Sequence, residues 1–169
     1  PEPAAQWTGT LAQERTSIEE NVIAPSSIRE LGKGRFVIDL GKVWAGVPRI
    51  RFSGGEPGTT VTLRGGDQLN AAGGIPPGTK SQSTNMEYQA VLSGGPFTFE
   101  PAGYLGMRYL QIDNAPMPVT RENFSFVTRH TKLDAGTATF ESPDHTLNAV
   151  WELMKHSLLT CAQEEFVDT

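Results

Sequence analysis

Cysteine is almost absent from the 169-residue chain, and this excludes two kinds of small domain. The single cysteine, Cys161, cannot form an internal disulfide, and no CxxC pair exists to bind zinc. Because Cys161 lies in a segment of apolar periodicity, the simplest prediction for it is a buried structural thiol rather than a reactive one.

Runs of basic residues and long apolar runs are also missing. The 14 Lys and Arg are scattered among 19 Asp and Glu, for a net charge of −5, so we do not expect nucleic acid as a partner. No apolar stretch approaches the roughly 20 residues that cross a bilayer, so we expect a soluble chain without a membrane partner. Residues 1–30 contain no apolar core of the signal-peptide type, and the first residue is Pro1 instead of Met, which predicts a processed or excised piece.

Glycine and proline, in contrast, are frequent, with 18 and 12 copies. From residue 35 onward they separate short runs rich in β-branched and aromatic residues, a pattern typical of an antiparallel β-sandwich. The segment 70–85 is poor in large apolar residues and is predicted to be a long exposed loop, and the Gly-rich segment 64–67 is interpreted as a turn. The expected strands are 17–24, 36–40, 47–53, 59–64, 86–92, 97–100, 107–113, 124–132 and 136–141.

The last part of the chain changes to a helical period. We expect one C-terminal helix over 142–162, with Ser142 as its cap, Pro143 at the first helical position and Asp144 at the positive end of the dipole. This helix has no obvious helical partner inside the chain, so we expect it to fold back on the sheet, to pair with another copy, or to open a further helical domain. Its apolar face contains Leu147, Val150, Trp151, Met154 and Leu158.

Several short motifs occur in an order that resembles a known family. They are Val37-Ile38-Asp39-Leu40-Gly41, Gly58-Thr59-Thr60-Val61-Thr62-Leu63-Arg64, Gly106-Met107-Arg108-Tyr109, Phe140-Glu141-Ser142-Pro143-Asp144 and Glu165-Phe166-Val167-Asp168-Thr169. Together they are similar to the bacterial α-L-rhamnosidases among the glycoside hydrolases. The resemblance implies an N-terminal connecting segment and edge strand in 1–34, a concanavalin-like (jelly-roll type) β-sandwich in 35–134, and the start of an (α/α)6 six-hairpin catalytic domain in 135–169.

The resemblance also implies a function for the parent protein. That family hydrolyses terminal α-L-rhamnosides with inversion, which requires a general acid and a general base. The matching carboxylates would lie beyond Thr169, so no catalytic residue is assigned here. Asp168 matches the start of the family's Asp-X-Pro-X-Arg stretch and would bind the sugar in the intact enzyme only. The implied partners are rhamnose-containing saccharides and the missing barrel; no cofactor is expected, and the compartment stays open between bacterial cytoplasm, periplasm and secretion.

A few residues have a functional and a structural interpretation. Trp44 is a possible sugar platform, although core or interface packing is favoured. Arg108 is expected to pair with Asp39 or Glu100 rather than with a ligand. Metal binding is not expected from the three histidines, because no HxH or HExxH spacing links them. They are His130, His145 and His156.

Three functions remain open at this point. The first is the non-catalytic sandwich portion of an α-L-rhamnosidase. The second is an independent carbohydrate-binding sandwich, which would need exposed aromatic side chains and polar groups that converge on one concave face. The third is a structural or interaction module that braces another domain. A titration of the chain with L-rhamnose separates the second function from the other two.

Overall fold

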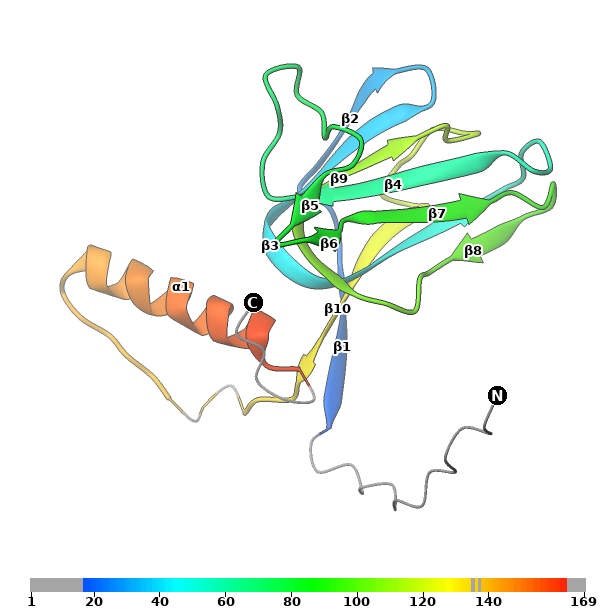
Figure 1. Cartoon of the computed structure of the whole chain (residues 1–169). Helices are drawn as coiled ribbons and strands as arrows, with labels where there is room; N and C mark the ends of the chain where they lie inside the picture. Colours follow the sequence, from blue (N-terminus) through cyan, green and yellow to red (C-terminus); the bar gives the residue numbers. More distant parts are fainter. Residues whose placement is uncertain (1–16, 135, 137, 164–169) are drawn as a thin grey trace, which may run out of the picture.

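A computed structural model describes residues 17–134, 136 and 138–163. The fold is a mainly antiparallel, curled β-sheet followed by one C-terminal helix (Figure 1), which confirms the predicted fold class. The strands are β1 (Ile18–Ile23), β2 (Ser27–Gly32), β3 (Arg35–Phe52), β4 (Thr60–Gly66), β5 (Lys80–Ser81), β6 (Thr84–Asn85), β7 (Glu87–Val91), β8 (Phe97–Phe99), β9 (Leu105–Asp113) and β10 (Phe124–Thr131), and the helix is α1 (His145–Cys161).

The long strand β3 holds the sheet together. Its first half pairs with β2, its second half pairs with β10 and β8, and both halves pair with β9, so the sheet curls around it. The sequence predicted two strands here, but the chain continues through a register shift between Asp39 and Trp44. Gly46 sits where β3 meets β10, and any Cβ at this position would collide with the backbone oxygen of Val127. This close approach explains why a glycine interrupts the apolar run.

The core lies inside the curl. Alternate side chains of β3, β4, β9 and β10 point inward, as the period of 2 in a strand requires. Each fully buried large side chain is worth roughly 1.5–3 kcal/mol relative to exposure. The cluster includes Phe36, Ile38, Leu40, Ile50, Phe52, Val61, Leu63, Met107, Leu110, Ile112, Phe124 and Phe126.

Three local predictions were wrong, and the predicted exposed loop at 70–85 has more structure than expected. β2 was missed, because it has only two large apolar residues, Ile28 and Leu31, in six positions before a tight turn at Gly34, where φ is +71°. The segment 64–66 is the buried end of β4 and not a turn: Gly65 packs against Met107, whose Cε would lie 2.7 Å from a Cβ there. The described residues of 136–141 are not in a strand, and the segment 70–85 contains the short β5–β6 hairpin.

The helix also begins later than predicted. Asp144 is the N-cap, and its Oδ1 accepts hydrogen bonds from the backbone nitrogens of Thr146 and Leu147 at 2.7 and 3.4 Å. Ser142 is instead held by Asn148, whose amide accepts from the Ser142 nitrogen at 2.9 Å and donates to its carbonyl at 2.8 Å. Asp144 replaces Ser142 as the cap because its carboxylate lies two residues nearer to the helix. There it accepts hydrogen bonds from two backbone N–H groups of the first turn that have no partner within the helix.

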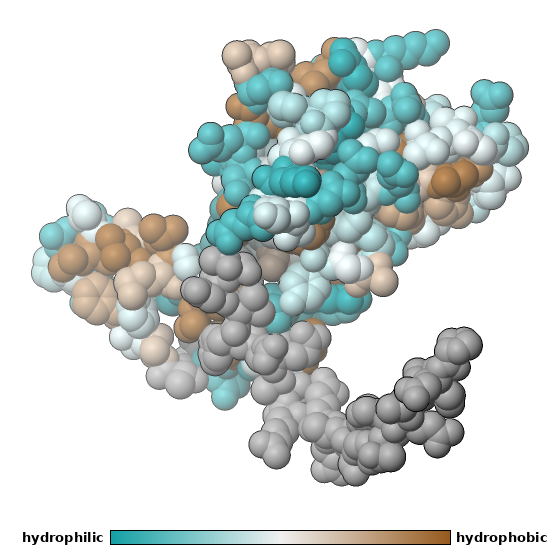
Figure 2. Space-filling view, in the orientation of Figure 1, coloured by the Kyte–Doolittle hydropathy of each residue, from teal (hydrophilic) through white to brown (hydrophobic). Residues whose placement is uncertain are grey.

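Helix α1 lies beside the sheet without burying a face. None of its residues is buried, and Figure 2 shows apolar side chains gathered on its surface. Trp151 is half-buried, with its ring centroid 5.7 Å from that of Phe140. Within the part of the chain that the structure describes, no helix is long and apolar enough to span a membrane. The exposed members of the predicted face are Leu147, Val150, Met154 and Leu158.

Candidate functional site

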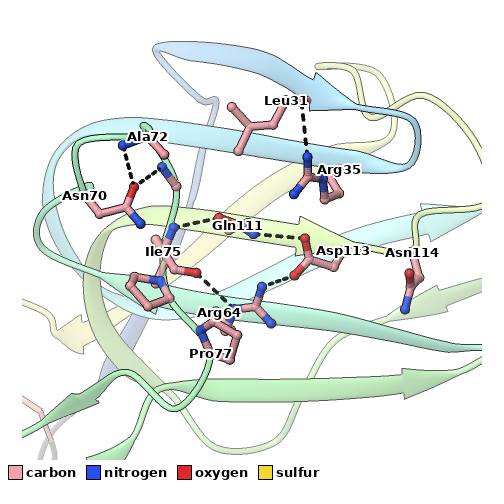
Figure 3. A pocket seen from close by; sticks show the side chains of 12 residues that line it. Leu31, Arg35, Arg64, Asn70, Ala72, Ile75, Pro77, Gln111, Asp113 and Asn114 are labelled. Carbon is pink, nitrogen blue, oxygen red and sulfur yellow. Dashed lines mark hydrogen bonds and ion pairs between the residues drawn. The ribbon is translucent and has the colours of Figure 1, made fainter.

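A polar cavity of about 580 Å³ opens beside β4 and β9 (Figure 3). Its floor is made of three side chains from these strands. Arg64 and Gln111 are only 8% and 5% exposed. The Arg64 guanidinium donates to one carboxylate oxygen of Asp113, and Gln111 Nε2 donates to the other at 2.9 Å. The network is therefore rigid, because each polar group is oriented by a neighbour.

The loop after β4 is fastened to this floor. Gln111 Oε1 accepts from the backbone nitrogen of Ile75 at 2.6 Å, and Arg64 Nε donates to the Ile75 carbonyl at 3.3 Å. Ile75 itself is 2% exposed. Further along, Asn70 Oδ1 accepts from the backbone nitrogens of Ala72 and Gly74, both at 3.0 Å. The loop predicted to be exposed thus has one buried anchor, and it forms a wall of the cavity.

The rim of the cavity carries Arg35, Asn114, Pro76 and Pro77. Asn114 has φ of +60°, a left-handed conformation that asparagine tolerates better than most residues. Its amide nitrogen donates to the carbonyl of Thr60 at 3.2 Å. Asp113 is the single carboxylate among the described lining residues, so the cavity does not hold the two carboxyl groups that inverting glycoside hydrolysis needs.

The sequence did not single out this site. Arg64 lies far along the chain from Gln111 and Asp113, and it meets them only because β4 and β9 are neighbours in the sheet. The available signal was the occurrence of charged and amide side chains in strands that are otherwise buried and apolar.

A second cluster of contacts joins α1 to β3. His156 Nε2 lies 2.6 Å from the carbonyl oxygen of Val43, and its ring meets the Trp44 indole edge-on, with centroids 4.6 Å apart and planes at 87°. The Lys42 Nζ lies 4.6 Å from the Trp44 ring centroid. Burial lowers the pKa of His156, with a smaller lowering by the charge of Lys42. These contacts accord with the interface interpretation of Trp44, while its role as a sugar platform stays a prediction.

Comparison with known proteins decides the family. Residues 29–130, which contain most of the sheet, match the family described as the bacterial α-L-rhamnosidase concanavalin-like domain. The chain belongs to this family. An α-L-rhamnosidase of Streptomyces avermitilis is 30% identical over 137 residues, which cover 80% of this chain and 13% of that protein.

Solved structures agree with this assignment. The structure of the Streptomyces avermitilis α-L-rhamnosidase complexed with L-rhamnose has a TM-score of 0.76 and 26% identity, and the match covers 94% of this chain and 16% of that one. The α-L-rhamnosidase from Dictyoglumus thermophilum shares the fold with a TM-score of 0.78 at 20% identity, over 88% of this chain and 17% of that one. The matched part of this chain thus spans less than a fifth of the length of these relatives.

Other predicted residues have clear positions. Arg108 pairs with Asp39, as expected, through Nε and a terminal nitrogen at 3.1 and 3.2 Å, and this bond lowers the pKa of the Asp39 carboxyl. Glu100, the alternative partner, pairs with Arg49 instead. Cys161 is half-buried rather than buried.

The histidines and Asp168 complete the predicted set. His130 lies in β10, while His145 opens α1 and His156 lies in its body. In the described ranges, no group of three His, Cys, Asp or Glu side chains is placed to hold a metal ion. Asp168 lies outside the described residues.

Proposed function

We propose that this chain is the non-catalytic β-sandwich portion of an α-L-rhamnosidase, whose parent enzyme hydrolyses terminal α-L-rhamnosides with inversion. The observation that carries the proposal is the family match over 29–130, together with the small share of each relative that the chain spans. A separate acid and base would then come from a part of the parent outside this chain.

The proposed division of the chain follows from the same reasoning. Residues 1–34 form an N-terminal connecting segment that adds edge strands to the sheet. Residues 35–134 form the sandwich, and residues 135–169 begin the catalytic barrel. The exposed apolar face of α1 supports this division, because Leu153 and Met154 are 65% and 60% exposed in the chain as described. Side chains of this size gain roughly 1.5–3 kcal/mol each from full burial, which a neighbouring helix would supply.

The role proposed for the sandwich is to brace the catalytic domain. The end of α1 is tied to β10, since the backbone nitrogen of Thr131 donates to the carbonyl of Ala162 at 2.6 Å. The body of α1 is tied to β3 through His156 and Val43. Two attachment points fix the direction of a helix, so the sandwich would set the orientation of the helical domain that α1 begins.

Asp168 is proposed to hold rhamnose hydroxyls in the intact enzyme, beside the general acid and without transferring the proton itself. A charged hydrogen bond is worth roughly 1.5–3 kcal/mol, so Asp168→Ala in the full-length enzyme is expected to lower kcat/KM by about one to two orders of magnitude. Wild-type kinetics for this variant would refute the role.

A direct assay tests the proposed function. The isolated chain and the full-length parent are purified in parallel and given an aryl α-L-rhamnoside. The full-length protein is expected to release the aglycone with inversion, and the chain is expected to stay at background, because an acid and a base each supply about 10²–10⁴-fold. A full-length protein that is inactive on rhamnosides, or a purified chain that turns over, would overturn the proposal.

A further inference from the structure

The cavity beside β4 and β9 has hydrogen-bonding groups that the fold itself does not use. Among the described residues, no hydrogen bond engages the amide nitrogen of Asn70 or the amide oxygen of Asn114. The Arg35 guanidinium makes one long hydrogen bond, 3.4 Å to the carbonyl of Leu31. All three side chains line the same cavity, so it offers donors and an acceptor to a molecule that enters it.

Two of these groups, the side-chain amides of Asn70 and Asn114, are held in place before any ligand arrives. The Asn70 side chain is fixed because its Oδ1 accepts hydrogen bonds from two backbone nitrogens. The Asn114 side chain is fixed because its amide nitrogen donates to the Thr60 carbonyl. Fixed polar groups lose little side-chain entropy on binding, which favours recognition by a few directed bonds.

The formal charges of the floor, of Glu87 beside it and of the rim cancel one another. Arg64 bonds to Asp113 and lies 3.9 Å from Glu87, so one cation faces two carboxylates. Among the described residues that line the cavity, Arg35 alone adds a further positive charge, at the rim, where it is exposed to solvent. This balance favours a neutral polar ligand over an anion or a cation.

We propose that this cavity binds one unit of a neutral saccharide. Sugar hydroxyls would donate to Asn114 Oδ1 and accept from Asn70 Nδ2 and the Arg35 guanidinium. The C–H face of the ring would lie against the aliphatic surfaces of Pro76 and Pro77, which also line the cavity. None of the described residues that line the cavity is aromatic, so the affinity is expected to be weak, with a Kd of about 1–10 mM.

An NMR titration of the ¹⁵N-labelled chain with L-rhamnose tests this site; the choice of probe rests on the proposed function. Amide signals of Ala72, Gly74 and Asn114 are expected to shift in a saturable manner. Arg35→Gln and Asn114→Gly should each weaken binding at least about threefold, since both lose a hydrogen bond. Glycine suits the positive φ at position 114, so the turn is retained.

Arg51→Gln is the matched control. Arg51 is an exposed arginine on the same strand that also donates to a backbone carbonyl, that of Glu122, but it lies outside this cavity. Its binding curve should equal that of the wild type. Absence of shifts in the wild-type chain, or equal weakening by all three variants, would overturn the proposal. Equivalent shifts with sodium sulfate would also overturn it, because they would indicate an anion site.

The outcome is separable from that of the proposed function. If the full-length protein hydrolyses rhamnosides while the chain shows no shifts, the cavity proposal fails alone. If the chain binds sugar at these residues while the full-length protein hydrolyses no rhamnoside, the cavity proposal stands and the proposed function fails.

Discussion

The curled sheet and helix α1 are two apolar elements with opposite outcomes. In the sheet, side chains such as Ile38 and Phe126 are completely buried, whereas α1 buries none of its residues and leaves Leu153 65% exposed. Both elements have a regular pattern of apolar residues, so the pattern alone does not decide burial. The difference is that the sheet curls on itself and provides its own partner, while α1 makes few contacts with the sheet, chiefly with β3 and β10 (Figure 1).

The largest expected difference in stability is that between truncating one apolar side chain in the sheet and truncating one in α1. Phe126→Ala should lower the free energy of unfolding by about 3–5 kcal/mol, since it empties a packed site. Leu153→Ala on α1 should change it by no more than about 0.5 kcal/mol. Urea denaturation of the isolated chain measures both values. Similar losses for the two variants would show that α1 is part of the same packed core.

A buried and a half-exposed arginine give the next comparison. The Arg64 side chain is 9% exposed. Arg64→Met should lower the free energy of unfolding by about 3 kcal/mol, because Asp113 loses its ion-pair partner in a buried network. Arg49, with a side chain 35% exposed, pairs with Glu100, and Arg49→Met should cost at most about 1 kcal/mol. Both are measured by urea denaturation. A smaller loss for Arg64→Met than for Arg49→Met would contradict the role of this network in fastening the loop.

These examples show what the sequence allows one to predict. The fold class and most strands follow from local alternation and turn residues, because those signals lie within a few neighbouring positions. The floor of the cavity does not follow, since Arg64 and Asp113 meet through strand pairing between distant segments. Pairing of Arg108 with Asp39 was predicted from opposite charges, but the sequence left Glu100 as an equal alternative.

The pair formed by Asp39 and Arg108 gives a smaller, pH-dependent effect. The hydrogen bond from Arg108 lowers the pKa of Asp39 below 3.8 in the folded chain. As the pH falls, the Asp39 carboxyl is therefore protonated in the unfolded chain before it is protonated in the folded chain. The stabilisation by the Asp39–Arg108 pair is complete above pH 3.8 and is lost as the pH falls through the pKa of Asp39 in the folded chain. Asp39→Asn should destabilise the chain less than Arg64→Met does, and only at pH values above this range. Thermal unfolding at several pH values checks this, and a loss independent of pH would contradict it.

The smallest effect is expected where α1 touches the sheet. Because burial lowers the pKa of His156 below 6.5, the unfolded chain binds the proton more readily, and stability should decrease as the pH falls from 6.5 through the folded pKa. An NMR titration of the imidazole gives the folded pKa directly. His156→Gln should remove this part of the pH dependence, and a His156 that titrates above 6.5 would contradict the buried contact.

Hydrogen exchange tests the central comparison most directly. The isolated chain and the full-length parent are labelled in deuterium oxide, and protection is compared between the amides of β3 and those of α1. Strong protection of β3 is expected in both proteins, whereas α1 should exchange far faster in the isolated chain and become protected in the parent. Equal protection of α1 and β3 in the isolated chain would contradict the claim that this helix depends on a partner outside the sheet.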